Sequence, residues 1–523
     1  AQATCAQASE VVSGPQSAVT ARMPVRHRGC RGWTPGLAWS LAICGLLSRG
    51  IEPLGFHVPS TEAGRRSDGR CVFQRPRYGG SLSSCGQRWP KVATAADTES
   101  TTELVEAVEP EDSAGTGALI VNLCKNLVGA GILSLPGGVA AVSAAKTAVL
   151  PASWLTILVG MSCAYTFSLI GRGLSLTNSQ SYRGAWEKAI GKESAWLVTA
   201  SVTFKTGMAC LVYAMVLGDA GSSLAAGFGL PADLAARTPM TLLISLFFLL
   251  PLSFLENLEV LKYTSFLGLS GILYTLGAMA FRLQQHAYTA GGKYHMLTSA
   301  ALRPTFSSTP GSWLSLPSMI FVSCLAFAFT AHYNAPKFYV QANEKLSKYN
   351  TVVAGGFGAC ILLCILMMAV GFLSFGGASA GLILNNYAAS DKLFLIARLG
   401  ISLNILCTFP LIFVSFREGI IESLPTQQRE RAEKLKTPMT LGLLGATTLL
   451  AVLLKDLGPV AAVGGAVLGS AINYIFPSLI FLGATKGKAR TKWLRLERFG
   501  VRGLIGFGVG LAVLGTLTSL GVV

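Results

Sequence analysis

From Gly117 onward, hydrophobic residues form long runs that short polar loops separate. A helix needs about 20 apolar residues to cross a bilayer core, and eleven runs reach or approach this length. We expect spans at residues 117–140, 147–171, 194–218, 238–255, 260–281, 314–333, 350–376, 392–416, 438–454, 458–483 and 501–522. The pattern predicts an all-α membrane protein with eleven transmembrane helices.

The first run is interrupted near its middle. Its sequence NLCKNLVGAGILSLP contains Gly129, Ala130 and Gly131, and a glycine costs about 1 kcal/mol in a helix interior. We interpret the run as a broken helix whose freed amides bind a carboxylate and whose freed carbonyls bind a cation. The alternative is that these small residues only permit close helix packing.

The sixth run is the second irregular one. Its apolar part, Pro317–Thr330, is short for a crossing. It is followed by AHYNAP, where Pro336 lacks an amide and biases the residue before it away from helical geometry. Because the interrupted runs are each the first of five, we expect two inverted five-helix repeats, spans 1–5 and 6–10, with span 11 as an extra C-terminal helix.

Charge is consistent with this topology. The chain is 51% hydrophobic and 13% charged, whereas soluble proteins are about a quarter charged. With residues at span ends counted in the adjoining loop, loops after even-numbered spans hold 20 lysines and arginines, and loops after odd-numbered spans hold 7. The positive-inside rule then places the N-terminus in the cytosol and the C-terminus outside. The net charge of +17 therefore does not indicate a nucleic-acid partner.

The N-terminal region has another composition. Residues 1–91 contain eleven arginines, one lysine and four acidic residues. After Met23, basic residues precede the short apolar run Leu37–Leu47, and an arginine-rich segment follows, as in two-part leaders that target plastids. A disordered basic tail is the alternative. Residues 92–115 hold seven acidic residues and are expected to form a disordered linker, which leaves 116–523 as the membrane domain.

Several segments resemble the amino acid/auxin permease family of secondary transporters (amino acid transporter, transmembrane domain family). NLCKNLVGAGILSLPGG resembles the family's first span, AFTAHYNAPKFYVQA its sixth and VGFLSFG the end of its seventh. LILNNYAASDKLFLIARLGISLNILCTFPLIFVSFREGI resembles its eighth span with flanks, and GAVLGSAINYIFPSLIFL its tenth. The resemblance covers roughly residues 115–523. It implies eleven spans, the inverted-repeat fold and cation-coupled amino-acid transport by alternating access.

The candidate substrate site combines the two breaks. We expect its residues to be Gly129, Ala130, Gly131, Phe329, Thr330 and His332, with Tyr213 as a further wall. For aromatic residues in an apolar span, simple packing is the more frequent role. We expect an amino acid as substrate, a lipid bilayer as surroundings, a functional monomer, and no cofactor beyond the coupling ion, H⁺ or Na⁺.

For the coupling ion we favour a proton. The candidate carrier is His332, which lies where span 6 must unwind, and an unperturbed histidine titrates near neutrality. Alternatively, His332 only hydrogen-bonds the broken backbone. Sodium is the second possibility: the resemblance makes Asn126 an ion ligand, and Asn404 and Thr408 share a helix face, unless they are ordinary helix-bonded polar residues.

Three further basic residues lie within the spans. Lys125 precedes the first break and either acts there or is structural, whereas Lys205 and Arg398 are expected to pair with carbonyls or to extend toward the membrane surface. The twelve cysteines, five in the N-terminal region and seven in the spans, show no disulfide or zinc spacing.

Other classes of protein fit the sequence less well. An enzyme is not expected, because the five histidines lie near no acidic cluster within a span. A channel is disfavoured, because broken helices paired across repeats imply alternating access. A non-transporting amino-acid sensor of the same fold is the remaining alternative. The leader favours an intracellular membrane, plastid or vacuole-like, over the plasma membrane.

Overall fold

The computed structural model describes residues 115–255, 264–313, 315–424, 428–429, 434–488 and 491–522. The predicted leader and almost all of the predicted linker lie outside the described residues. Those two domain assignments therefore stay predictions.

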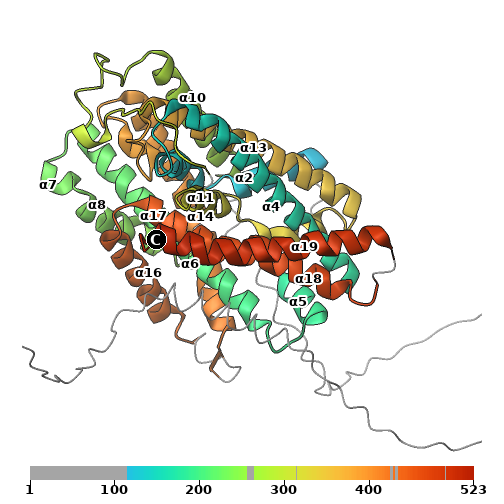
Figure 1. Ribbon diagram of the computed structural model, residues 1–523. Coiled ribbons are helices and arrows are strands. Elements are labelled where there is room, and N and C mark those ends of the chain that lie inside the picture. Colours follow the sequence, from blue (N-terminus) through green and yellow to red (C-terminus); the bar gives the residue numbers. More distant parts are fainter. Residues whose placement is uncertain are drawn as a thin grey trace, which may run out of the picture.

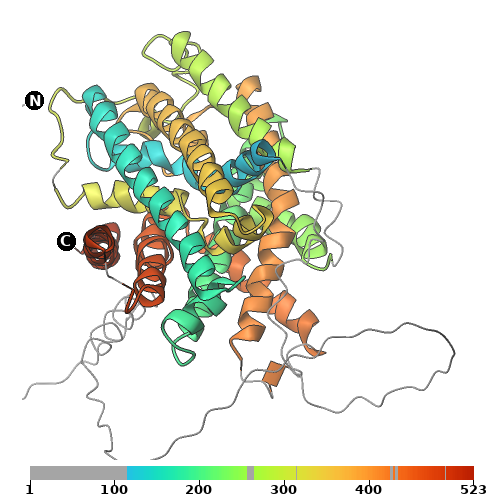
Figure 2. The same ribbon diagram turned by 90° about the vertical axis from the view of Figure 1, so that its right-hand side faces the viewer.

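The described residues form a bundle of helices (Figures 1 and 2). They contain no strand, only two isolated β-bridges, so the prediction of an all-α fold is confirmed. The long helices are α4 (Val149–Thr177), α6 (Trp196–Gly227), α10 (Thr264–Gln284), α13 (Leu346–Phe375), α14 (Lys392–Glu422), α16 (Lys436–Leu453) and α19 (Lys492–Gly510).

The remaining helices are short or continue one another. They are α2 (Thr116–Leu127), η1 (Ala130–Ser134), α3 (Leu135–Ala140), η2 (Lys146–Ala148), α5 (Tyr182–Ala189), α7 (Ala232–Ala235), α8 (Arg237–Ile244), η3 (Ser245–Leu249), α9 (Leu250–Leu252), η5 (Ala300–Leu302), α11 (Ser318–Ala328), η6 (His332–Asn334), α12 (Ala335–Gln341), η7 (Ile383–Asn386), α17 (Leu457–Gly464), η8 (Gly465–Ile475), α18 (Phe476–Ala484), η9 (Leu511–Gly515) and α20 (Thr516–Ser519).

The helices are long and apolar enough for a multi-pass membrane protein. Within the described residues, eight helical segments, the interrupted Ser318–Gln341 among them, meet the length and composition needed to cross a bilayer, and the bent pair formed by α2 and η1–α3 makes a ninth. The stretch Arg237–Leu252 is apolar but shorter. The full count of eleven spans stays a prediction.

The first predicted break is confirmed. Helix α2 ends at Leu127, and Gly129 is extended, with φ −103° and ψ −167°. The chain then resumes as η1 and α3, where Pro136 lies in the first turn of α3, a position at which the missing amide costs nothing. The two halves of the span are bent by 50°.

The sixth predicted span is also interrupted. Helix α11 ends at Ala328, and Ala331 leaves helical geometry with φ −135° and ψ 6°. The chain continues through η6 into α12, which carries Pro336 in its first turn. Ala335, the residue before Pro336, is itself helical, with φ −55° and ψ −40°, so the predicted departure from helical geometry at Ala335 is wrong. The chain leaves helical geometry earlier, at Ala331.

Helix α13 packs closely against both halves of the first span. A Cβ added to Gly356 would lie 2.8 Å from the Leu123 side chain of α2. A Cβ added to Gly371 would lie 2.6 Å from Pro136 of α3. Because such distances are too short for real contacts, only glycine at these two positions allows α13 to approach this closely.

The segment after α10 ties one end of the bundle together. Arg282 donates to both carboxylate oxygens of Asp391 at 2.7 and 2.9 Å, and Tyr288 donates to the same carboxylate at 3.0 Å. Burial, and then this carboxylate, raise the pKa of the Tyr288 hydroxyl above its ordinary value. The Thr305 amide donates to the Phe375 carbonyl at 3.1 Å, so this segment fastens the end of α13 and the start of α14.

Candidate functional site

A small cavity lies between the two interrupted spans. Its volume is about 70 Å³, which is room for roughly two water molecules. It is lined by Asn126, Leu127, Gly129, Ala130, Gly131, Lys205, Ala209, Val212, Tyr213, Phe327, Ala328, Thr330, Tyr333 and Ile412. These residues come from the first break, one face of α6, the second break and one position of α14.

The first break presents backbone to this cavity. The Ile132 amide donates to the Gly129 carbonyl at 3.3 Å, which makes it the first hydrogen-bonded amide of η1. The amides of Ala130 and Gly131 precede it and have no partner within their own helix. A Cβ added to Gly129 would meet nothing within 4 Å, so this side of the cavity is open.

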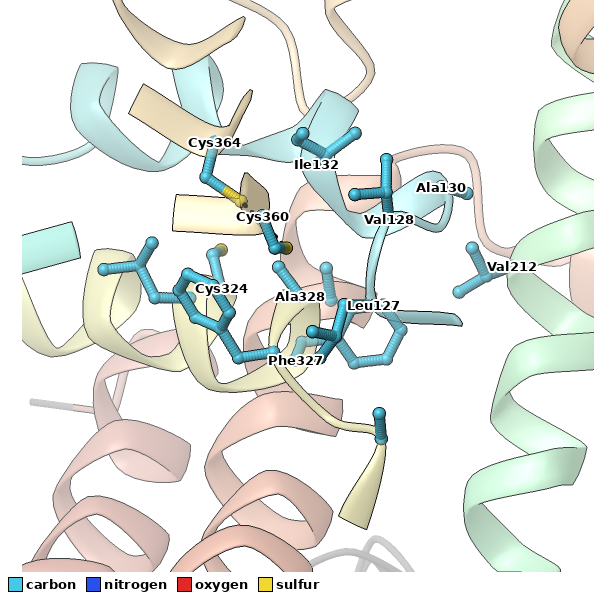
Figure 3. Packing of buried hydrophobic residues seen from close by; sticks show 14 of the residues in the cluster. Leu127, Val128, Ala130, Ile132, Val212, Cys324, Phe327, Ala328, Cys360 and Cys364 are labelled. Carbon is cyan, nitrogen blue, oxygen red and sulfur yellow. Dashed lines mark hydrogen bonds between the residues drawn. The ribbon is translucent and has the colours of Figure 1, made fainter. Parts of the chain in front are cut away.

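Side chains from α6 and α11 form the opposite walls. Figure 3 shows Ala130 facing Val212 of α6, with Leu127 beside Phe327 and Ala328 of α11. The wall is therefore mainly apolar around the exposed backbone of the first break.

The second break is filled by hydrogen bonds within the protein. The Thr330 hydroxyl donates to the Ala326 carbonyl at 2.5 Å. Asn473, fully buried in η8, donates to the same carbonyl at 2.8 Å and to the Thr330 hydroxyl at 3.2 Å. Thr330 thus lines the cavity, but its hydroxyl is held by neighbours.

Four of the six predicted substrate residues line the cavity, and two do not. Gly129, Ala130, Gly131 and Thr330 are brought together there. Phe329 is fully buried and stacks on Phe357 of α13, with ring centroids 6.4 Å apart. The predicted wall Tyr213 also lines the cavity.

His332 lies outside this lining set. Its Nε2 is 3.0 Å from both the Cys163 carbonyl and the Thr166 hydroxyl. Because a carbonyl only accepts, Nε2 carries the proton and donates to Cys163, and Nδ1 is left as a buried nitrogen without a partner. His332 is fully buried, and the Phe167 ring lies 5.3 Å from it. A role of His332 in substrate binding or proton coupling stays a prediction.

The structure does not gather the predicted sodium ligands at the cavity. Asn126 lines it, and its side-chain oxygen accepts from Asn334 at 3.2 Å. Thr408 donates to the Asn404 carbonyl one turn earlier at 2.8 Å, as in the helix-bonded alternative. Neither Thr408 nor Asn404 is among the residues that line the cavity. Their role as ligands stays a prediction.

The two buried basic residues differ from each other. Arg398 donates to the carbonyls of Leu384 and Tyr387 at 2.9 and 2.7 Å, as predicted. The same prediction for Lys205 is wrong: its side chain is only 7% exposed, lies over the Phe327 ring with Nζ 3.8 Å from the centroid, and lines the cavity. Lys205 therefore ends at the cavity and not at the membrane surface.

The sequence contained a signal for this wall of the cavity. Lys205, Ala209, Val212 and Tyr213 are spaced i, i+4, i+7 and i+8, so they lie on one face of α6. A single cation on the same face as a predicted wall residue, Tyr213, indicates a shared site. The contribution of Ile412 from α14 had no such signal.

A larger open depression, of about 540 Å³, lies elsewhere, at the start of α19. Its lining includes Trp493, which is 81% exposed, and the ion-paired side chains of Arg172 and Glu497. These are surface residues far from either break in sequence. Nor do the described residues contain a group of three or more histidine, cysteine or acidic side chains placed to hold a metal.

The fold and the cavity together define a multi-pass integral membrane protein with a small buried site at two interrupted helices. A family model described as transmembrane amino acid transporter protein matches residues 112–520. The chain belongs to this family, which confirms the resemblance found in the sequence and the prediction that it is not an enzyme.

Three relatives illustrate the match. The putative sodium-coupled neutral amino acid transporter 11 of Danio rerio is 24% identical over 77% of this chain and 86% of that protein. The sodium-coupled neutral amino acid transporter 7 of Mus musculus is 25% identical over 74% of this chain and 83% of its own. The vacuolar amino acid transporter 5 of Schizosaccharomyces pombe is 24% identical over 78% of this chain and 93% of its own.

Proposed function

We propose that the protein is a secondary active transporter that moves amino acids across a membrane by alternating access, coupled to a cation. The observation that supports this most is the first break, where two amides without helical partners face a buried cavity between two interrupted spans. A channel needs a continuous path, whereas a small cavity between two interrupted helices suits alternating access. The names of the relatives support amino acids as the substrate class.

The substrate's α-carboxylate docks on the amides of Ala130 and Gly131, beside Gly129. The start of η1 and α3 presents N–H donors and the positive end of the helix dipole. The substrate's ammonium faces the C-terminal ends of α2 and α11, whose residues Leu127 and Ala328 line the cavity. A site of about 70 Å³ must widen during the cycle to admit most amino acids.

We favour a proton as the coupling ion. The unpartnered Nδ1 of His332 is the atom that would accept it, and a nearby substrate carboxylate would stabilise the charged ring. Sodium, held by Asn126 with Asn404 and Thr408, is the alternative. The relatives' names include sodium-coupled and vacuolar transporters, so they do not choose between the ions.

The wider architecture belongs to the same proposal. It comprises eleven spans, inverted repeats of spans 1–5 and 6–10, a cytosolic N-terminus and a functional monomer. Similarity to vacuolar transporters supports residence in an intracellular membrane. Single-cysteine labelling tests the orientation: the loop between α14 and α16 must react from the side opposite to the segment between α10 and α11.

Uptake into liposomes that contain the purified protein tests the function. The panel is the twenty protein amino acids, with proton and sodium gradients imposed separately. We expect saturable accumulation of some amino acids under the proton gradient. Accumulation only under a sodium gradient would show that the coupling ion is sodium and not a proton. Binding without flux would indicate a sensor, and no binding of any amino acid would overturn the proposal.

A further inference from the structure

Lys205 is the one buried basic side chain in the described part of the chain that makes no hydrogen bond to a protein oxygen atom. Only two lysines or arginines there are buried, Lys205 and Arg398. Arg398 has two carbonyl partners, whereas the contact recorded for Lys205 is the face of the Phe327 ring. A buried charge without a hydrogen-bonding partner is costly, so a partner from outside the chain would stabilise Lys205.

The position of Lys205 identifies that partner. It shares the small cavity with the first break, and no acidic residue lines this cavity. The free amides of η1 also favour negative charge there. Because the cavity is only about 70 Å³, a small anionic group inside it would have both Lys205 and the residues of the first break on its walls.

We propose that Lys205 is the counter-ion of the substrate's α-carboxylate and that it selects against amino acids with cationic side chains. This rests on the proposed function. The amides of the first break orient the carboxylate, and Lys205 neutralises it. A second positive charge in so small a site would be repelled.

The test compares ligands with and without a carboxylate. Binding of the twenty protein amino acids and of their α-amides is measured for wild type, Lys205→Met and Lys205→Arg. Loss of a charge-assisted contact should weaken amino-acid binding to Lys205→Met by about 10- to 100-fold. Binding of the cationic amides should be unchanged or stronger, so the preference for the carboxylate falls by at least about tenfold. Lys205→Arg should keep most of the preference.

Lys146 offers a matched control. Its Nζ lies 4.9 Å from the centroid of the Phe306 ring, and it is exposed and outside the cavity. Lys146→Met therefore removes a lysine and the same kind of ring contact, and it should keep the wild-type preference. Should Lys205→Met fail to fold, Lys205→Gln is the second neutral variant.

The outcomes separate this inference from the proposed function. If a folded neutral variant binds amino acids as wild type does, or loses amino acids and amides equally, Lys205 is not the counter-ion. If wild type binds no amino acid at all, the proposed function itself fails.

Discussion

The two interrupted spans differ in what surrounds the break in the helix. At the first break, the Gly129 amide donates to the Leu127 carbonyl at 3.0 Å, whereas the next two amides, those of Ala130 and Gly131, have no partner within their own helix, and these residues line the cavity. At the second, Thr330 and His332 are held by Asn473, Thr166 and Cys163. The amides that begin η6, those of His332 and Tyr333, also have no partner within their own helix, so the two breaks differ in their side chains and not in their backbone. Unsatisfied backbone within a membrane costs several kcal/mol per group, and a ligand or water in the cavity would reduce this cost at the first break. The difference indicates that the first break binds the substrate and that the second break stabilises the fold.

Closing the first break should have the largest effect. A Cβ at Gly131 would lie 3.0 Å from the Phe327 ring and 3.3 Å from Ala328. We expect Gly131→Val to displace this wall, fill the cavity and weaken amino-acid binding by about 10- to 100-fold, since overpacking costs about 1–3 kcal/mol. Equilibrium binding to the purified variant measures this. Wild-type affinity in a folded Gly131→Val protein would show that the carboxylate docks elsewhere.

His332→Gln tests whether the second break carries the coupling proton in addition to stabilising the fold. Glutamine can still donate to the Cys163 carbonyl but cannot take up a proton. We expect the variant to bind and exchange amino acids while it loses accumulation driven by a proton gradient. Uptake into liposomes with and without the gradient is the measurement. If accumulation is as in wild type, His332 is purely structural, and the sodium site at Asn126 and Thr408 becomes the better hypothesis.

Asn473→Ala should loosen the second break without touching the first. The variant leaves the Ala326 carbonyl and the Thr330 hydroxyl with one fewer donor each, which costs about 1–3 kcal/mol when the groups are buried. A lower thermal unfolding temperature in detergent is the expected result. Thr447→Ala, which removes a hydroxyl bonded within its own helix at 2.8 Å, is the control and should change stability less. Equal unfolding temperatures for the two variants would contradict a supporting role.

Gly129→Ala should have the smallest effect. Its backbone has a negative φ of −103°, and an added Cβ meets nothing within 4 Å. We expect no loss of stability and a gain of up to about 1 kcal/mol, because alanine restricts the unfolded chain. Thermal unfolding measures it. A clear loss of stability would mean that the bare backbone is more crowded than its geometry indicates.

Both breaks could be predicted from the sequence because glycine and proline act locally. Gly129 and Pro336 limit backbone conformation whatever surrounds them. The apolar runs likewise predicted where helices form, although some ends differ: α6 continues to Gly227 where the prediction ended at 218, and α19 begins at Lys492 where the prediction began at 501. The two breaks were thus confirmed, whereas the predicted effect of Pro336 on Ala335 was wrong.

The side-chain partners could not be predicted in this way. Whether His332 faces the cavity or Cys163 depends on how α4 packs against the second break, which residue type does not reveal. The sequence predicts that Lys205 pairs with carbonyls or extends toward the membrane surface, because the cavity next to it exists only in the folded bundle. The only sequence signal for the position of Lys205 was its shared helix face with Tyr213 on α6. To use that signal, one must know which face of α6 points into the bundle.

The close packing of α13 on both halves of the first span has a mechanical consequence. Gly356 lies against α2 and Gly371 lies against α3, so one uninterrupted helix, α13, contacts both halves of the span across the 50° bend. If the transport cycle changes this angle, one half of the span must move away from its glycine on α13 while the other half stays in contact with α13. Larger residues at positions 356 and 371 would then change the angle between α2 and α3 in the unliganded protein. They would shift the equilibrium between conformations open to the two sides of the membrane without entering the binding cavity.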